Sequence, residues 1–168
     1  RVPGSVLWLL ADNAWAEANM RAFAAAHGIA PERLIFAGRV SPADYLARFR
    51  VVDVFLDTFP YNAGTTANDV LWMGTPIVTR AGRSYISRMA ASLLTHVGLP
   101  ELVTESLDDY EKLAITLGNT PARVASYKRY LAEHGRSSAL FDMPGFVRDY
   151  EAALERLALD HRTARPST

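Results

Sequence analysis

Short apolar runs alternate with longer amphipathic segments along most of the chain. Five runs have the length of a strand, and they cover residues 5–10, 34–37, 54–57, 77–79 and 101–103. Continuous apolar runs without alternation are typical of parallel strands whose two faces are both covered. Amphipathic segments that follow the first four runs predict helices over residues 14–27, 42–51, 65–73 and 85–97. This order predicts an α/β fold in which right-handed crossovers place helices on both faces of a parallel sheet.

Three further helices are predicted to close the chain. The capping box that begins at Ser106 starts a helix to about residue 117, and Pro121 opens another that runs to about residue 134. Apolar residues at helical spacing predict a last amphipathic helix over residues 146–157. We therefore expect one domain over residues 1–159 and a flexible polar tail over residues 160–168.

The stretch over residues 56–72 carries the clearest candidate chemistry. It runs from a strand through a turn into a helix, and the unpaired first amides of a helix favour anions such as a diphosphate. Gly64 lets the backbone approach a ligand closely, Thr65 and Thr66 add hydroxyl donors, and Asp69 lies one turn further in, where it could accept hydrogen bonds from a ribose. The alternative interpretation is that a threonine caps the helix and that Asp69 is a solvated acid.

Two further groups of residues are candidates for ligand contact. Tyr45 and Arg48 are three residues apart on a predicted helix, so they share a face that could stack on and hydrogen-bond a base. Arg80, Arg83 and Arg88 follow the fourth strand, at the sheet edge where doubly wound folds bind ligands, and they are candidates for phosphate contact. For each group the alternative is a packing residue or an ordinary surface charge.

Composition excludes several classes of function. Lysine plus arginine and aspartate plus glutamate each number 18, so a neutral chain of 168 residues gives no reason to expect a nucleic acid or an anionic membrane as partner. The chain has no cysteine, which excludes disulfides, thiolate metal sites and a cysteine nucleophile. No apolar run approaches the roughly 20 residues of a membrane span, so we predict a cytoplasmic protein.

The chain contains no convincing general base. We expect its histidines to be capping, core or surface residues rather than catalysts; they are His27, His96, His134 and His161. The first strand begins almost at Arg1, and we therefore expect the chain to be a fragment of a longer protein.

Several ordered motifs make a family resemblance specific. They are Leu56-Asp57-Thr58-Phe59-Pro60-Tyr61, Gly64-Thr65-Thr66, Asp69-Val70-Leu71-Trp72-Met73-Gly74-Thr75-Pro76 and Ser87-Arg88-Met89-Ala90-Ala91-Ser92-Leu93-Leu94. Together they resemble the O-GlcNAc transferase and SPINDLY family, over about residues 2–157. The resemblance implies a Rossmann-like, three-layer α/β fold, namely the carboxyl-terminal nucleotide-sugar half of a GT-B glycosyltransferase.

The resemblance also implies roles for individual residues. Thr65 and Thr66 match the positions that hold the donor's diphosphate, and Asp69 matches the position that binds ribose. Ser41 and Arg48 match positions that line the base pocket. The implied ligand is a nucleotide sugar, and no metal or other cofactor is implied.

Two positions depart from the pattern of the family. Tyr45 stands where O-GlcNAc transferases usually have a histidine of the base pocket, and Gly64 replaces a histidine beside the phosphates. The motif over residues 58–61 is similar to the SPINDLY branch, whereas the motif over residues 69–72 is similar to the UDP-GlcNAc branch. The donor therefore stays open between UDP-GlcNAc and GDP-fucose.

The family's first strand of this domain, and the lysine that follows it, should lie upstream of Arg1. In the usual strand order that strand is central, between the strands predicted over residues 5–10 and 54–57. We expect this chain to leave a gap in its sheet, to fill the gap with a partner chain, or to pair those two strands directly. Exposed strand edges favour a homodimer or strand exchange.

The resemblance implies an inverting enzyme that moves N-acetylglucosamine from UDP-GlcNAc to serine or threonine hydroxyls of an acceptor protein. This piece would supply the site for the leaving nucleotide and would be inactive alone. One alternative is protein O-fucosylation from GDP-fucose, as in the SPINDLY branch. A second is a catalytically silent module that binds nucleotides or other proteins.

Overall fold

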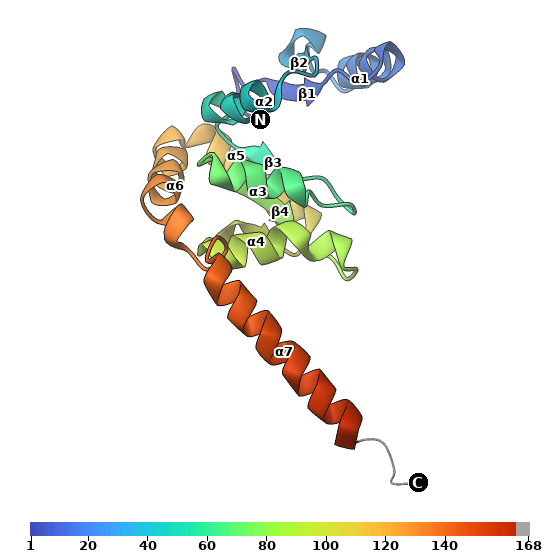
Figure 1. Ribbon diagram of the computed structural model, residues 1–168. Helices are drawn as coiled ribbons and strands as arrows, with labels where there is room; N and C mark the ends of the chain where they lie inside the picture. The colour runs from blue at the N-terminus through green and yellow to red at the C-terminus, as the bar shows by residue number, and fades with distance from the viewer. Residues whose placement is uncertain (164–168) are drawn as a thin grey trace.

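The computed structural model describes residues 1–163, and it confirms the predicted order of strands and helices (Figure 1). The strands are β1 (Leu7–Leu10), β2 (Leu34–Ala37), β3 (Phe55–Leu56), β4 (Ile77–Arg80) and β5 (Val103–Thr104). The helices are α1 (Ala14–Ala26), α2 (Pro42–Arg48), α3 (Thr65–Trp72), α4 (Met89–Val97), α5 (Leu107–Asn119), α6 (Pro121–His134) and α7 (Met143–Thr163).

Tight 3-10 turns account for most of the differences from the predicted boundaries. Residues Phe49–Val51 continue α2 as such a turn, and residues Ile86–Arg88 precede α4 as another. A third turn, Pro100–Leu102, delays the last strand to Val103, two residues later than predicted. Proline at the first position of that turn favours the turn over an extended strand.

All strand pairs are parallel, but the strands form two separate sheets. One sheet pairs β1 with β2, in a register that places Leu7 opposite Leu34. The other has the order β3-β4-β5. Within residues 1–163, β1 and β3 are not hydrogen-bonded to each other, so the sheet has a gap at the predicted place and direct pairing of those strands is wrong.

Strand β1 is less buried than its apolar sequence predicts. The side chains of Leu7 and Leu10 are 45% and 49% exposed, whereas Ile77 and Val78 on β4 are fully buried. The prediction that both faces of this strand are covered is therefore wrong. The reason is that no described strand continues the sheet from β1 toward β3, so the core around β4 does not reach β1.

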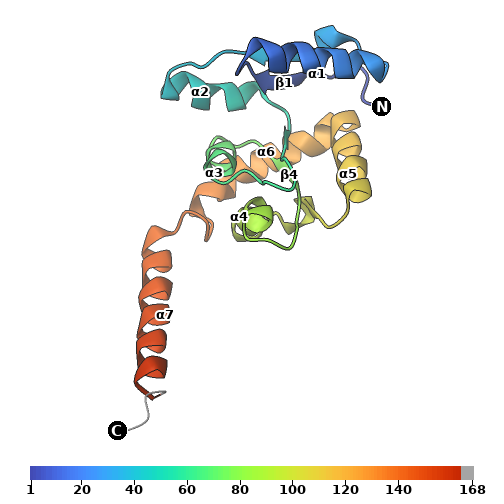
Figure 2. The same ribbon diagram turned by 90° about the vertical axis from the view of Figure 1, so that its right-hand side faces the viewer.

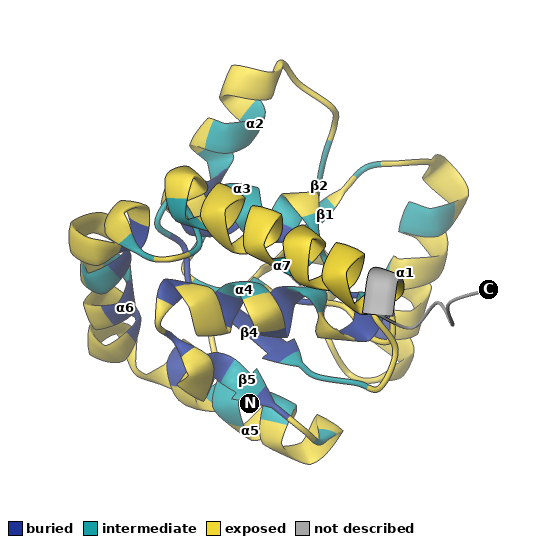
Figure 3. Ribbon diagram, turned by 60° about the horizontal axis from the view of Figure 1, so that its bottom comes forward, coloured by how far each residue is buried: buried dark blue, intermediate teal, exposed yellow. Residues whose placement is uncertain are grey.

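The core forms around β4, as the buried residues in Figure 3 show. Helix α3 lies on one side of β4 and α5 on the other (Figures 1 and 2). Buried apolar side chains from both helices, from α4 and from α6 pack together with the strand; they include Val70, Leu71, Ile77, Val78, Leu94, Val97, Leu117 and Leu131. This layered packing holds the ends of β3 and β4 and the start of α3 in one rigid region.

Helix α7 is longer than predicted and projects away from the rest of the molecule (Figure 1). It continues to Thr163, past the predicted domain end at residue 159, so the predicted tail begins inside the helix. Residues 164–168 of that tail lie outside the described residues. Within residues 1–163, no helix combines the length and the hydropathy of a membrane span.

Candidate functional site

Asp57, at the end of β3, organises the loop that leads to α3. One carboxylate oxygen, Oδ1, accepts hydrogen bonds from the amides of Thr58 (2.9 Å) and Ala63 (2.8 Å). The other, Oδ2, accepts from the hydroxyl of Thr79 on β4 at 2.6 Å. Because this side chain is only 5% exposed, it ties the two ends of the loop and the neighbouring strand together inside the protein.

Burial also sets the protonation of this network. Burial raises the pKa of the Asp57 carboxyl, although the hydrogen bonds from Thr79, Ala63 and Thr58 act in the opposite direction. Tyr110, on α5, donates its hydroxyl hydrogen to the backbone oxygen of Asp57 at 3.0 Å. Burial, and secondly the charge of Asp57, raise the pKa of Tyr110 to about 12. Both groups therefore resist ionisation more than they would in water.

Asn62 completes the same loop. Its side chain is fully buried, and Nδ2 donates to the carbonyl of Thr58 at 2.7 Å. Within the part of the chain that the structure describes, the Oδ1 atom of Asn62 has no hydrogen-bond partner. An unpaired buried acceptor is costly, so a hydrogen-bond donor that reached it would stabilise the loop.

The amino end of α3 has no side-chain cap. Gly64 occupies the capping position, and no side chain accepts hydrogen bonds from the first amides of this helix. The alternative interpretation, in which Thr65 or Thr66 caps the helix, is therefore wrong. A Cβ atom on Gly64 would lie 3.2 Å from the Cε of Met89, so the absence of a side chain lets α4 approach closely.

A cavity of about 580 Å³ opens at this helix terminus. Its volume lies within the range of small-molecule sites. It combines an apolar wall with polar groups from the loop and the helix start, and the lining includes Phe55, Thr58, Asn62, Gly64, Thr65, Thr66 and Met89. The structure thus brings three of the predicted site residues, Gly64, Thr65 and Thr66, into one concave surface with free amide donors.

Tyr45 lies near the predicted ribose residue Asp69 and the predicted phosphate residue Thr66. Burial raises the pKa of the Tyr45 hydroxyl, hydrogen bonding with Thr66 lowers it, and the charge of Asp69 together with a hydrogen bond to that carboxylate raises it. The tyrosine ring also packs edge-on against Phe49, with ring centroids 5.1 Å apart. The structure therefore places Tyr45 from α2 against Thr66 and Asp69 from α3.

Ser41 and Arg48 have local structural partners and do not line the cavity at α3. The Ser41 hydroxyl accepts from the amide of Asp44 at 3.2 Å and donates to its carboxylate at 2.8 Å, so it caps α2. Arg48 donates to the carbonyl of Gly38 at 2.8 Å and lies 5.7 Å from the ring centroid of Trp8. Arg48 therefore contacts the connection between β2 and α2 and the neighbouring strand β1, whereas Ser41 is engaged at the start of α2.

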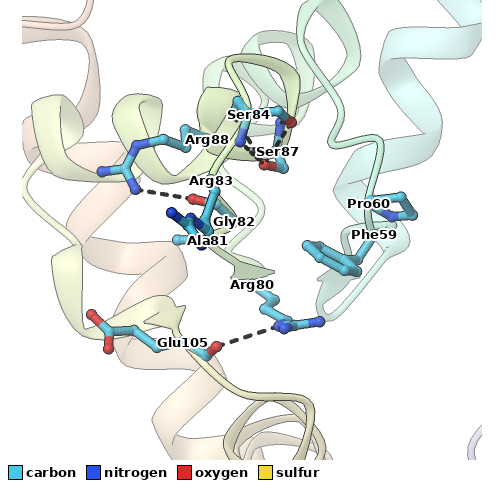
Figure 4. A pocket seen from close by; sticks show the side chains of 10 residues that line it. All are labelled: Phe59, Pro60, Arg80, Ala81, Gly82, Arg83, Ser84, Ser87, Arg88 and Glu105. Carbon is cyan, nitrogen blue, oxygen red and sulfur yellow. Dashed lines mark hydrogen bonds between the residues drawn. The ribbon is translucent and has the colours of Figure 1, made fainter.

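Arg80, Arg83 and Arg88 line a second cavity of about 570 Å³, which we call the arginine groove (Figure 4). Its lining consists of Phe59, Pro60, Arg80, Ala81, Gly82, Arg83, Ser84, Ser87, Arg88 and Glu105. These arginines, which the sequence predicts as phosphate contacts, therefore do not line the cavity at α3. The two cavities adjoin the same segment, because Phe59 and Pro60 line the arginine groove while Thr58 and Tyr61 line the cavity at α3.

Two of the histidines have carbonyl partners in their own helices. His27 Nδ1 lies 2.8 Å from the carbonyl oxygen of Phe23, and His96 Nδ1 lies 2.8 Å from that of Ser92. In residues 1–163, histidine and acidic side chains form no group of three or more that could hold a metal ion.

Sequence reasoning missed Asp57 and Asn62 as site residues. The available signal for Asp57 was an acid that directly ends an apolar strand, because such a side chain must find donors at the sheet edge. Asn62 gave no such signal, because asparagine in a turn is ordinarily exposed.

Comparison with known proteins identifies the family. The profile of glycosyl transferase family 41 matches residues 1–150. The UDP-N-acetylglucosamine–peptide N-acetylglucosaminyltransferase of Caenorhabditis elegans is 33% identical over 165 residues, which are 98% of this chain and 14% of the relative. The probable enzyme SEC of Arabidopsis thaliana is 34% identical over 90% of this chain and 16% of its own length. A probable enzyme named SPINDLY from Hordeum vulgare is 36% identical over 66% of this chain and 12% of its own length.

A solved structure agrees with the sequence relatives. A mutant of the O-GlcNAc transferase of Thermobaculum terrenum superimposes with a TM-score of 0.88 and 32% identity, and the match covers 95% of this chain and 32% of that chain. The chain therefore spans between about one eighth and one third of the proteins it matches. The predicted Rossmann-like half of a GT-B fold is confirmed. This chain belongs to glycosyl transferase family 41, in the part that contains the O-GlcNAc transferase and SPINDLY relatives.

Proposed function

We propose that the chain is the donor-binding part of an inverting protein O-glycosyltransferase, which moves N-acetylglucosamine from UDP-GlcNAc to serine or threonine hydroxyls of an acceptor protein. All three relatives reported above carry names that state this donor and a peptide acceptor. Because the chain spans only 14%, 16% and 12% of those relatives, the activity belongs to a longer protein and this chain supplies one part of it.

The observation that carries the proposal is the uncapped amino end of α3, which opens into a cavity of about 580 Å³. The free amides and the hydroxyls of Thr65 and Thr66 donate hydrogen bonds to the donor's diphosphate there. The positive end of the helix macrodipole adds to this attraction. As the glycosidic bond breaks, charge grows on the leaving diphosphate, and donors already in position stabilise that charge without reorganisation.

The ribose and the base extend from the diphosphate toward α2. Asp69 accepts hydrogen bonds from the ribose hydroxyls, and Tyr45 lies near the Asp69 carboxylate on the neighbouring helix. Ser41, Tyr45 and Arg48 line the base side of the site in this proposal. The guanidinium of Arg48 contacts the Gly38 carbonyl through one nitrogen, which leaves further N–H donors for the base.

GDP-fucose is the second candidate donor. It is favoured by the motif over residues 58–61, which is similar to the SPINDLY branch, and by Tyr45 and Gly64 at the positions where the resemblance implies histidines. A catalytically silent nucleotide-binding module is the third candidate. The three differ in ligand: the first binds UDP and UDP-GlcNAc, the second GDP and GDP-fucose, and the third binds nucleotides without any transfer by the longer protein.

Titration calorimetry of the chain with UDP and GDP tests the donor site. We expect UDP to bind, and Asp69→Ala to weaken it about tenfold or more, because a hydrogen bond to a charged group is worth roughly 1.5–3 kcal/mol. Asp108→Ala is the matched control, since Asp108 is an exposed acid in the first turn of α5. It should leave the affinity unchanged.

Three results would contradict the proposal in different ways. Tighter binding of GDP than of UDP would indicate that GDP-fucose is the donor. Unchanged UDP affinity in both Asp69→Ala and the Thr65→Ala, Thr66→Ala double variant would remove the site from α3. If the chain bound UDP but the longer protein transferred no sugar, the result would support the third candidate, a catalytically silent nucleotide-binding module.

A further inference from the structure

The arginine groove concentrates positive charge in a chain whose net charge is zero. We propose that this groove binds an acidic segment of the acceptor protein, an inference that rests on the proposed glycosyltransferase function. The groove would then select acceptors whose serine or threonine lies near several carboxylates.

Within residues 1–163, the three guanidinium groups have no acidic partners. The ion pairs found among residues 1–163 do not involve Arg80, Arg83 or Arg88. Glu105 is the only acid in the lining, and it meets Arg80 through its backbone oxygen, at 3.3 Å from Nε. Its carboxylate points away from Arg80 in Figure 4. The groove therefore presents cations that a carboxylate-bearing ligand can pair.

Packing holds two of these arginines in position. The guanidinium of Arg80 lies 4.0 Å from the ring centroid of Phe59, and Arg88 donates to the Gly82 carbonyl at 3.1 Å. Each guanidinium has five N–H donors, so one backbone contact leaves several free for a ligand. Positioned arginines lose less rotamer entropy on binding than freely moving ones.

The arrangement of the arginines favours an extended acidic chain over a single phosphate. In Figure 4 the guanidinium groups of Arg80 and Arg88 lie at different ends of the groove, with Arg83 between them. A phosphate is held best where several donors converge on one point. Cations spread along a groove instead match carboxylates spaced along a polypeptide.

The groove also lies where an acceptor must lie. Phe59 and Pro60 form its wall, and the flanking Thr58 and Tyr61 line the proposed donor cavity. On the other side, Ser87 and Arg88 line the groove while Ile86 and Met89 line the donor cavity. A polypeptide in the groove would therefore pass directly beside the bound nucleotide sugar.

Fluorescence anisotropy with labelled peptides tests this inference on the chain itself. One probe carries a serine flanked by glutamates, and the other has the same sequence with glutamines. We expect the glutamate peptide alone to bind, with affinity that falls as salt is raised. Arg83→Glu should weaken that binding about fivefold or more, since an exposed charge pair is worth up to about 1 kcal/mol and reversal adds repulsion. Arg83 is exposed and makes no hydrogen bond in the described structure, so the variant should fold.

Arg129→Glu is the matched control, because Arg129 is an exposed arginine on α6, away from the groove. It should bind the glutamate peptide as the unmodified chain does. Equal binding of the two peptides, or equal loss of affinity in Arg83→Glu and Arg129→Glu, would overturn the inference.

UDP titration of the same variants separates this inference from the proposed donor site. We expect Arg83→Glu to bind UDP normally. If it lost UDP affinity and inorganic pyrophosphate displaced the peptide, the arginines would belong to the phosphate site instead. Tighter binding of a single-stranded oligonucleotide than of the glutamate peptide would also overturn the inference. A chain that bound the acidic peptide but not UDP would support the groove and contradict the donor site.

Discussion

Single side chains shape the loop between β3 and α3. Asp57 accepts hydrogen bonds from both ends of that loop and from β4, and Tyr110 reaches the same residue from α5. The loop therefore has its shape before any ligand arrives. A site with this preorganisation spends little free energy on ordering itself when it binds.

Tyr110→Phe tests this network through its pH dependence. The pKa of Tyr110 is about 12 in the folded protein, above its ordinary value of 10.0, so the stability it contributes is complete below pH 10 and is lost as pH rises toward 12. We expect the free energy of unfolding to fall in this range, and to fall less steeply in Tyr110→Phe. At neutral pH the variant should be about 1 kcal/mol less stable, because it lacks the hydrogen bond to Asp57.

Urea unfolding at a series of pH values from 7 to 12 measures both effects. Tyr150→Phe is the control, because Tyr150 is 56% exposed on α7. Identical alkaline slopes in the unmodified chain and in Tyr110→Phe would contradict the role given to Tyr110.

For single residues, the sequence predicts contacts between chain neighbours better than contacts between residues that lie far apart in the chain. Gly64, Thr65 and Thr66 meet in one cavity because a helix start places consecutive residues around the same free amides. The partners of Asp57 on β4 and α5 lie 22 and 53 residues along the chain. Periodicity and capping rules carry no information about which distant donors will reach a given acid.

The helices of this chain differ in whether a side chain caps their amino end. Helices α1, α2 and α5 begin with side-chain caps from Asn13, Ser41 and Ser106. Helix α3 begins with Gly64 and, like α4 and α6, has none. Capped termini contribute to stability, whereas the uncapped terminus of α3, which opens into a cavity, keeps its amides available to a ligand.

Ser106→Ala should lower the free energy of unfolding by about 1 kcal/mol, since the hydroxyl accepts a hydrogen bond from the Asp109 amide that water replaces poorly. Ser126→Ala is the matched control inside α6, and it should change stability by less than about 0.5 kcal/mol. Thermal or urea unfolding measures both. An equal effect of the two substitutions would show that the cap does not stabilise α5.

Element boundaries are predictable where the signal is local. The caps and prolines before α2, α5 and α6 place the starts of these helices correctly. The burial of β1 was not predictable in this way, because it depends on what lies beside the strand and not on the strand's own residues. An apolar run predicts that a strand can be covered, and only the assembled sheet shows whether it is.

The whole molecule contains two sheets that do not join. Strand β1 pairs with β2 along one edge, and within residues 1–163 its other edge has no strand partner. Large apolar side chains are exposed on and around it, including Val6, Leu7, Trp8 and Leu10. Exposed apolar edges of this kind favour pairing with another chain.

We therefore expect the chain to self-associate through β1. Light scattering at increasing concentration should show dimers, and Leu7→Lys should shift the population toward monomer, because a charge on an edge strand opposes pairing. Ala125→Lys at an exposed position of α6 is the control for a general gain of charge. A strictly monomeric species at all concentrations would contradict this expectation.

The length of helix α7 fixes the distance between its two ends. Its 21 residues span about 30 Å at 1.5 Å per residue, which is close to the diameter of a small domain. Apolar side chains recur along one face of it, and all are exposed; they are Met143, Phe146, Val147, Tyr150, Leu154 and Leu157. A second domain that packed against this face would be held by a rigid rod whose far end lies well beyond the sheet. The length of the helix would then determine the spacing between the two domains.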